Sequence, residues 1–145
     1  MKQELQEKLY KKYPKIFKQK DLPMTETCMC WGINCADGWY ALIDNLCWYI
    51  SKTVEHEKCP PIEAVQVKQK FGGLRFYTGG IDKKISSEIN NYINFAEGLS
   101  LSICEECGTT TDVKQTKSGW VVTLCPTCME KFNRTPVEEM AIDDK

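Results

Sequence analysis

Two Cys-x-x-Cys turns near the C-terminal end of the chain restrict its fold more than any other feature. They are Cys104-Glu-Glu-Cys107 and Cys125-Pro-Thr-Cys128, with seventeen residues between them. This spacing is typical of a structural zinc site, in which two turns present four thiolates at about 2.3 Å from one ion. Gly108 follows the first pair and allows a sharp backbone turn there. We therefore predict one structural zinc ion, with the ligands Cys104, Cys107, Cys125 and Cys128.

Two disulfides or a redox-active dithiol are the alternative explanations of these cysteines. A redox Cys-x-x-Cys usually occurs once, at the junction of a strand and a helix. Here two copies flank a short alternating segment at 120–124, which is predicted to be a strand. A catalytic zinc ion keeps an open coordination position. Four cysteine ligands leave none, so we expect the ion to stabilise the fold of this segment.

Length and composition are those of one ordinary domain. The 145 residues are 42% hydrophobic and 27% charged, which allows a real core. The net charge of −1 argues against a general nucleic-acid binder, because such proteins are usually basic. Nine cysteines, an N-terminus without an apolar leader and the absence of a long apolar run favour a reducing cytoplasm and no membrane.

Hydrophobic periodicity predicts three helices in the first hundred residues. They cover residues 2–13, residues 38–55 with Asp37 as the N-cap, and residues 85–99. Between Val65 and Thr78, two alternating segments flank Gly72-Gly73, which predicts a β-hairpin with a two-residue turn. Thr135 and Glu138 have capping-box spacing, which predicts a last short helix.

The expected fold class is α+β, with two principal amphipathic helices, a β-hairpin and a C-terminal zinc-ribbon-like module with four cysteines. Residues 1–102 form the body, which consists of a helix, a sulfur-rich loop, a long helix, the hairpin and a helix. The module covers residues 103–132, and a short helix or tail covers residues 133–145. Since almost no linker separates module and body, we expect the module to pack on the same domain.

The predicted hairpin has one apolar and one basic face. With Gly72-Gly73 as the turn, Phe71 faces Leu74 and Lys68 faces Tyr77. The face expected to be buried consists of Val65, Val67, Phe71, Leu74 and Phe76. The other face includes the candidate binding residues Lys68, Lys70, Arg75 and Tyr77. Such a strip can contact phosphates or an acidic protein, and an ordinary solvated sheet face is the alternative.

Three further features have both a structural and a functional explanation. The first twenty residues hold seven Lys and two Glu, a local charge of +5 that is either solvated or meets an acidic partner. Trp48 and Tyr49 fall off the apolar stripe of the long helix and either cover the sulfur-rich loop or form exposed contacts. A second metal site is the alternative to core packing for Cys28, Cys30 and Cys35, with Cys47, His56 or Cys59 as the fourth ligand.

No set of residues predicts catalysis. His56 is the single histidine, and its neighbours Glu55 and Glu57 are expected to point elsewhere because adjacent helical residues do not face each other. Cys59 follows three residues after His56, so a nucleophilic Cys–His pair in a hydrolase is the alternative. We expect a protein that is not an enzyme.

Several short segments together suggest a family. They are Tyr13-Pro14, Asp37-Gly38-Trp39, Leu42-Ile43-Asp44, the run from Gln66 to Tyr77, Ala96-Glu97 and the paired Cys-x-x-Cys. With these segments the chain resembles, over about residues 9–128, a family of small uncharacterised proteins encoded by tailed bacteriophages and prophages. The Lys-Phe-Gly-Gly-Leu-Arg-Phe-Tyr segment at 70–77 is the most specific part. Relatives often have Gly in place of Ala36 and sometimes His in place of Cys128, and neither difference affects the metal prediction.

The resemblance implies an accessory protein that acts in the cytoplasm of an infected bacterium. We therefore expect a zinc-stabilised, non-enzymatic binding protein that engages and modulates or inhibits a host protein, such as a defence or nucleic-acid-processing enzyme. The alternative is a nucleic-acid-binding zinc-ribbon protein that uses the basic hairpin face. The sequence leaves the oligomeric state open.

Overall fold

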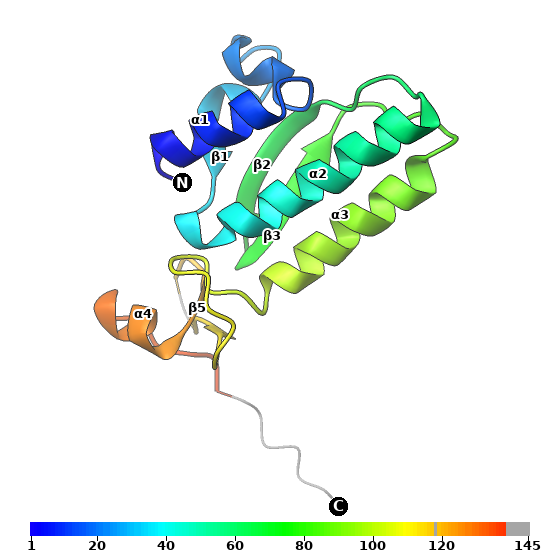
Figure 1. The fold of residues 1–145 in the computed structure, drawn as a ribbon. Helices are drawn as coiled ribbons and strands as arrows, with labels where there is room; N and C mark the ends of the chain where they lie inside the picture. Colours follow the sequence, from blue (N-terminus) through cyan, green and yellow to red (C-terminus); the bar gives the residue numbers. More distant parts are fainter. Residues whose placement is uncertain (118, 139–145) are drawn as a thin grey trace, which may run out of the picture.

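Helices α2 (Tyr40–Glu57) and α3 (Ser86–Ser100) lie side by side across one face of a three-stranded sheet (Figure 1). The computed structural model describes residues 1–117 and 119–138. The strand order is β1 (Ile33–Asn34), β2 (Ala64–Lys70) and β3 (Gly73–Thr78), with β1 parallel and β3 antiparallel to β2. Helices, a small sheet and a C-terminal cysteine cluster confirm the predicted α+β class.

The remaining elements cover the edge of the sheet and build the cysteine-rich module. Helix α1 (Gln3–Lys12) covers the β1 edge, where the Gln6 Oε1 atom accepts a hydrogen bond of 2.9 Å from the Ile33 backbone N–H. The module contains β4 (Lys114–Gln115), β5 (Thr123–Leu124) and α4 (Pro126–Lys131). Short 3₁₀ turns occur at Lys18–Asp21, Met29–Trp31 and Asp37–Trp39.

One apolar core joins the two long helices to the sheet. Because α2 places residues at i, i+3, i+4 and i+7 on the same side, its core stripe is continuous, as the periodicity predicted. The sheet contributes alternate residues from β2 and β3 to the same cluster. The central members of this core are Ile43, Leu46, Cys47, Ile50, Val67, Leu74, Phe76, Ile89, Ile93 and Ala96.

The hairpin exists, but its predicted register was wrong. The turn residues are Phe71 and Gly72, with φ of 51° and 79°, and Lys70 pairs with Gly73. Two positive φ angles define a type I′ turn, whose backbone twist fits the twist of the flanking strands. Phe71 is therefore 73% exposed at the tip instead of lying in the core. Since the register differs from the predicted one by two residues, most residues of the strands keep their predicted faces. Val65 is the exception, because an irregularity between Ala64 and Gln66 places Ala64 in the core instead.

The predicted start of α2 and the predicted last short helix were also wrong. Asp37 is not the N-cap of α2, because its Oδ1 atom accepts a hydrogen bond of 2.7 Å from the Lys2 backbone N–H and the helix begins at Tyr40. The segment that starts at Thr135 is extended up to Glu138, and Val137 N donates to Gln115 O of β4 at 2.8 Å. Pairing with β4 satisfies backbone groups that a single marginal helical turn would leave exposed. Residues 139–145 of the predicted tail lie outside the described residues.

Trp48 and Tyr49 point outward from α2, which agrees with the alternative that they form exposed contacts and not with the one that they cover the sulfur-rich loop. They are 44% and 50% exposed, and their rings lie edge to face with centroids 4.9 Å apart. The Tyr49 ring also lies 5.6 Å from the ring of Tyr92 on α3. Both residues therefore belong to the outer surface of the helix pair.

The cysteine-rich module docks on the body at the start of α2. Gly38 N donates to Glu105 O at 2.7 Å, and the Trp39 indole N–H donates to Ile103 O at 2.9 Å. Gly38 and Gly108 face each other, so the two backbones approach without side chains between them. The expectation that the module packs on the same domain is therefore met by direct contacts.

The Gly38 contact predicts that a single methyl group would separate module and body. A Cβ atom at this position would lie 2.5 Å from Glu105 O and 2.6 Å from Gly108 N, whereas real Cβ contacts are essentially never shorter than 3.0 Å. We expect Gly38→Ala to lower the free energy of unfolding, measured by urea denaturation, by about 2 kcal/mol or more.

Gly98→Ala is the matched control for this variant. A Cβ atom at Gly98 on α3 would meet nothing within 4 Å. Because alanine favours a helix over glycine, this variant should be unchanged or more stable by up to about 1 kcal/mol. Equal stability of Gly38→Ala and the original protein would contradict the close backbone contact.

Candidate metal centre and the hairpin face

The four predicted ligands come together from two turns at opposite ends of the module. Cys104 and Cys107 lie in the turn after α3, Cys125 directly precedes α4, and Cys128 lies in the first turn of that helix. Their Sγ atoms all lie within 4.8 Å of one another. Cys107 is exposed, and the other three cysteines are buried. Among residues 1–117 and 119–138, no other group of cysteine, histidine and acidic side chains has this geometry.

The distances fit one tetrahedral ion and not two disulfides. Four sulfur atoms at about 2.3 Å from a zinc ion lie about 3.8 Å from one another in a tetrahedron. The Cys107 and Cys125 Sγ atoms are 3.7 Å apart, far beyond the S–S bond of about 2.05 Å. All nine cysteines are free thiols. The cluster could therefore hold a metal ion, and four sulfur ligands would close its coordination sphere.

The protonation of the cluster also favours a cation. A hydrogen bond from the Cys128 backbone N–H lowers the pKa of the Cys125 thiol to about 7. Burial raises the pKa of the Cys128 thiol well above its usual value. One thiolate forms readily at neutral pH, whereas the cluster ionises fully only when a positive ion offsets the mutual repulsion of the sulfurs.

The residues considered for a second metal site have other surroundings. Cys35 and Cys47 are buried, and burial raises the pKa of the Cys35 thiol to about 12. The Cys30 thiol donates to Thr27 O at 3.3 Å, and Cys28 is exposed. This agrees with the core-packing explanation for Cys35 and Cys47.

Glu105, between the first two ligands, is a buried carboxylate that the sequence did not single out. Its Oε1 atom accepts a hydrogen bond of 3.1 Å from the Ala36 backbone N–H, and its buried Oε2 atom has no hydrogen-bond partner. Burial raises the pKa of Glu105 from 4.5 to about 7. No sequence signal identifies this residue, because it is buried by docking against residues far away in the chain.

The hairpin face consists of Lys68, Lys70, Arg75 and Tyr77, as predicted. Lys68 pairs directly with Arg75 across the strands, and its Nζ atom lies 6.0 Å from the centre of the Tyr77 ring. The Lys70 Nζ atom lies 5.6 Å from the centre of the Phe71 ring. In the described part of the chain, none of these three cations forms an ion pair with a carboxylate.

The lysine-rich N-terminal segment differs from the hairpin face. Four of its lysines form ion pairs: Lys2 with Asp37, Lys12 with Asp44, Lys18 with Glu63 and Lys20 with Asp21. These carboxylates neutralise part of the local positive charge. The segment therefore resembles the solvated alternative more than a binding surface.

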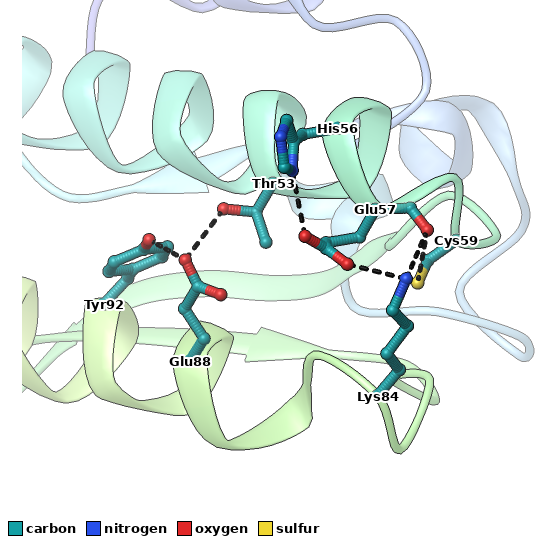
Figure 2. A network of polar contacts seen from close by, with 7 residues as sticks. All are labelled: Thr53, His56, Glu57, Cys59, Lys84, Glu88 and Tyr92. Carbon is teal, nitrogen blue, oxygen red and sulfur yellow. Dashed lines mark hydrogen bonds and ion pairs between the residues drawn. The ribbon is translucent and has the colours of Figure 1, made fainter.

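A polar network joins the end of α2 to the start of α3 (Figure 2). The Glu57 carboxylate lies 2.9 Å from His56 Nδ1 and 2.6 Å from Lys84 Nζ. The expectation that these neighbours do not meet was wrong, because Glu57 is the last residue of α2 and its side chain turns back toward the ring. The Cys59 thiol donates to the Glu57 carbonyl at 3.7 Å. The network holds the two helices together at this end.

No protein-family model, curated protein or solved structure matches the chain. Among the helices of the described residues, none combines the length and the apolar character needed to cross a membrane.

The cluster predicts about one equivalent of bound zinc per chain. We expect Cys104→Ser or Cys125→Ser to lose the metal, because three thiolates and a hydroxyl bind zinc far more weakly. Elemental analysis of the purified proteins measures this. Cys28→Ser is the control, since Cys28 is exposed and lies outside the cluster, and it should keep its zinc. Zinc retained by Cys104→Ser would contradict the assignment.

Glu105 predicts a loss of stability as the pH rises. Its pKa of about 7 in the folded protein exceeds the usual 4.5, so the folded state binds more protons between these values. Stability that is present near pH 4.5 is then lost as the pH rises toward 7. We expect Glu105→Gln to be more stable than the original protein by roughly 1–3 kcal/mol at pH 8, with a smaller difference at pH 6. The measurement is urea denaturation with zinc present at both pH values.

The exposed neighbour Glu106 provides the control for this prediction. Its negative charge only adds to the rise in the Glu105 pKa that burial causes, so Glu106→Gln should keep most of the pH dependence. An identical pH dependence of the original protein and Glu105→Gln would show that the buried carboxylate does not titrate in this range.

Proposed function

We propose that the chain is a zinc-stabilised binding protein without a catalytic role, and that it recognises an acidic protein surface through the hairpin face. The observation that carries this proposal is the set of three cations, Lys68, Lys70 and Arg75, that no carboxylate of the described chain neutralises. The closed cysteine cluster supports a structural ion, because it leaves no coordination position for a substrate.

Electrostatics favour an anionic partner for this face. Lys68 and Arg75 lie directly opposite each other, and like charges in that position repel and weaken the pairing of the strands. An acidic partner removes this repulsion and forms charge-assisted hydrogen bonds with the same groups. Tyr77, two residues after Arg75 on the same face of β3, is 40% exposed and offers an aromatic ring and a hydroxyl group for contact. The local charge can steer association although the whole chain has a net charge of −1.

The cysteine-rich module holds the end of the hairpin in place through two hydrogen bonds. The Gln69 side-chain amide donates to Val121 O at 3.0 Å, and the Thr123 hydroxyl donates to Gly72 O at 2.6 Å. Both bonds join the end of the hairpin, at Gln69 in β2 and Gly72 in the turn, to the segment that precedes Cys125. Zinc therefore has a role in recognition without touching the partner, because it keeps the end of the hairpin in place.

The sequence resemblance to phage-encoded proteins suggests the biological setting. In that setting the partner is a host protein whose activity is modulated or inhibited by binding. An acidic surface on a nucleic-acid-processing or defence enzyme has the chemistry that the hairpin face would recognise.

Nucleic acid is the second candidate, and a specific observation favours it. Phe71 and Tyr77 are 73% and 40% exposed, and each has a lysine Nζ atom near its ring. Exposed aromatic rings beside cations are the elements with which proteins stack and neutralise single-stranded nucleic acid. This candidate predicts binding that weakens steeply with salt.

Charge reversal on the hairpin face tests the proposal. We expect the triple variant Lys68→Glu, Lys70→Glu, Arg75→Glu to reduce recovery of a protein partner at least tenfold in affinity capture from nuclease-treated bacterial lysate. The physical reason is that attraction to an acidic surface becomes repulsion. Zinc content and thermal unfolding of the variant confirm that it folds.

The matched control reverses the same number of charges on another basic segment. Lys8, Lys11 and Lys15 in the N-terminal segment are exposed, and their triple change to Glu should leave capture intact. Loss of capture in this control alone would contradict the role of the hairpin face. Binding of a labelled single-stranded oligonucleotide that only the hairpin variant loses, without any captured protein, would favour the second candidate.

A further inference from the structure

Exposed apolar side chains gather along one strip of the outer surface of the two long helices. We call it the helix-pair face, defined by Leu42, Trp48, Tyr49, Tyr92, Phe95 and Leu99. Phe95 is 70% exposed, and Tyr49, Trp48 and Leu99 are 50%, 44% and 40% exposed. A groove of about 280 Å³ runs between α2 and α3, and five of these six residues line it, all except Trp48. An exposed apolar patch of this kind usually marks an interface.

The face is held in a fixed shape. Each helix contributes a pair of residues that are seven positions apart, which is about 10 Å or two turns of a helix. The pairs are Leu42 and Tyr49 on α2, and Tyr92 and Leu99 on α3. The Tyr92 hydroxyl donates to the Glu88 carboxylate, which also accepts a hydrogen bond from Thr53 on α2 (Figure 2). The aromatic wall of the groove is therefore already positioned, and little ordering is required on association.

The charge of the face suits a second copy of the same chain. The residues that line the groove carry no charge, and Asn45 is the one amide among them. In a two-fold dimer the same patch meets itself, so every charged group near the axis would face a like charge. Attraction to a charged partner would instead require charges at the centre of the patch. The exposed amides Asn91 and Asn94 on α3 can form a polar rim.

The exposed area is sufficient for a small dimer. Aromatic side chains can bury about 150–250 Å² each, so Trp48, Tyr49 and Phe95, together with Leu99, leave on the order of 400–500 Å² of apolar surface per chain. Two copies together would bury about 800–1,000 Å² of these four side chains, and Leu42 and Tyr92 in the groove add to this area, which brings it to the approximate lower limit of a specific interface. Interfaces at this lower end of the size range are typical of weak complexes, so we expect association at micromolar concentrations.

We propose that a second copy of this chain covers the helix-pair face and forms a two-fold dimer. The helix pair of one copy then packs face to face on the helix pair of the other. Phe95 of each copy enters the groove of its partner. This inference goes beyond the proposed function, because the hairpin face lies on the opposite side of the sheet. A dimer of this kind presents two hairpin faces, one on each side.

Sedimentation equilibrium of the zinc-loaded protein at about 5–200 μM tests the dimer. We expect the original protein to approach twice its monomer mass of 16.7 kDa at the upper concentrations. Phe95→Glu should raise the dissociation constant of the dimer at least tenfold, because it places a carboxylate in an apolar groove. Since Phe95 is exposed, the variant should keep its zinc content and its thermal stability.

Trp120→Glu is the matched control, because Trp120 is 71% exposed but lies on the metal module. It should dimerise like the original protein. A monomer at 200 μM, or an unchanged dimer of Phe95→Glu, would overturn the proposal. Salt separates this inference from the proposed function: the dimer should persist in 0.5 M NaCl, whereas attraction between the hairpin face and an acidic partner should be lost.

Discussion

The contact between the first Cys-x-x-Cys turn and the start of α2 connects the cysteine cluster to the rest of the protein. Gly38 and Gly108 allow the two backbones to touch, and Gly38 N donates to Glu105 O. Trp39, fully buried, adds an indole hydrogen bond to Ile103 O. Because α2 is also the central helix of the core, a displacement of this turn would be transmitted to the sheet.

A second contact joins the cysteine-rich module to the hairpin of the three-stranded sheet. Gln69 and Thr123 link the hairpin to the module from opposite sides, so the module touches both α2 and the β2–β3 turn. The buried Glu105 carboxylate weakens this arrangement, since one of its oxygens has no partner. The hydrogen bonds and the metal ligands on either side must offset that cost.

The two exposed faces have opposite chemistry because of the alternation of a β-strand. Residues of β2 and β3 that point toward α2 and α3 are buried and, except for Gln69, apolar, and the alternate residues form the basic hairpin face. The groove on the outward side of the helix pair, in contrast, is lined by uncharged and mostly apolar residues. A charged ligand and an apolar partner can therefore bind at the same time without competing for one surface.

The amino-acid sequence by itself determined the features that depend on local spacing. These are the three helices with their apolar stripes, the hairpin with its basic alternate residues and the four cysteine ligands, because periods of 2 and 3.6 residues and the Cys-x-x-Cys spacing are visible in any linear chain. Tertiary structure alone decided the turn at Phe71-Gly72, the extended segment after Thr135 and the burial of Glu105. Each of these depends on contacts between residues far apart in the chain. The energies of such contacts exceed local conformational preferences, and the spacing of residues along the sequence does not reveal them.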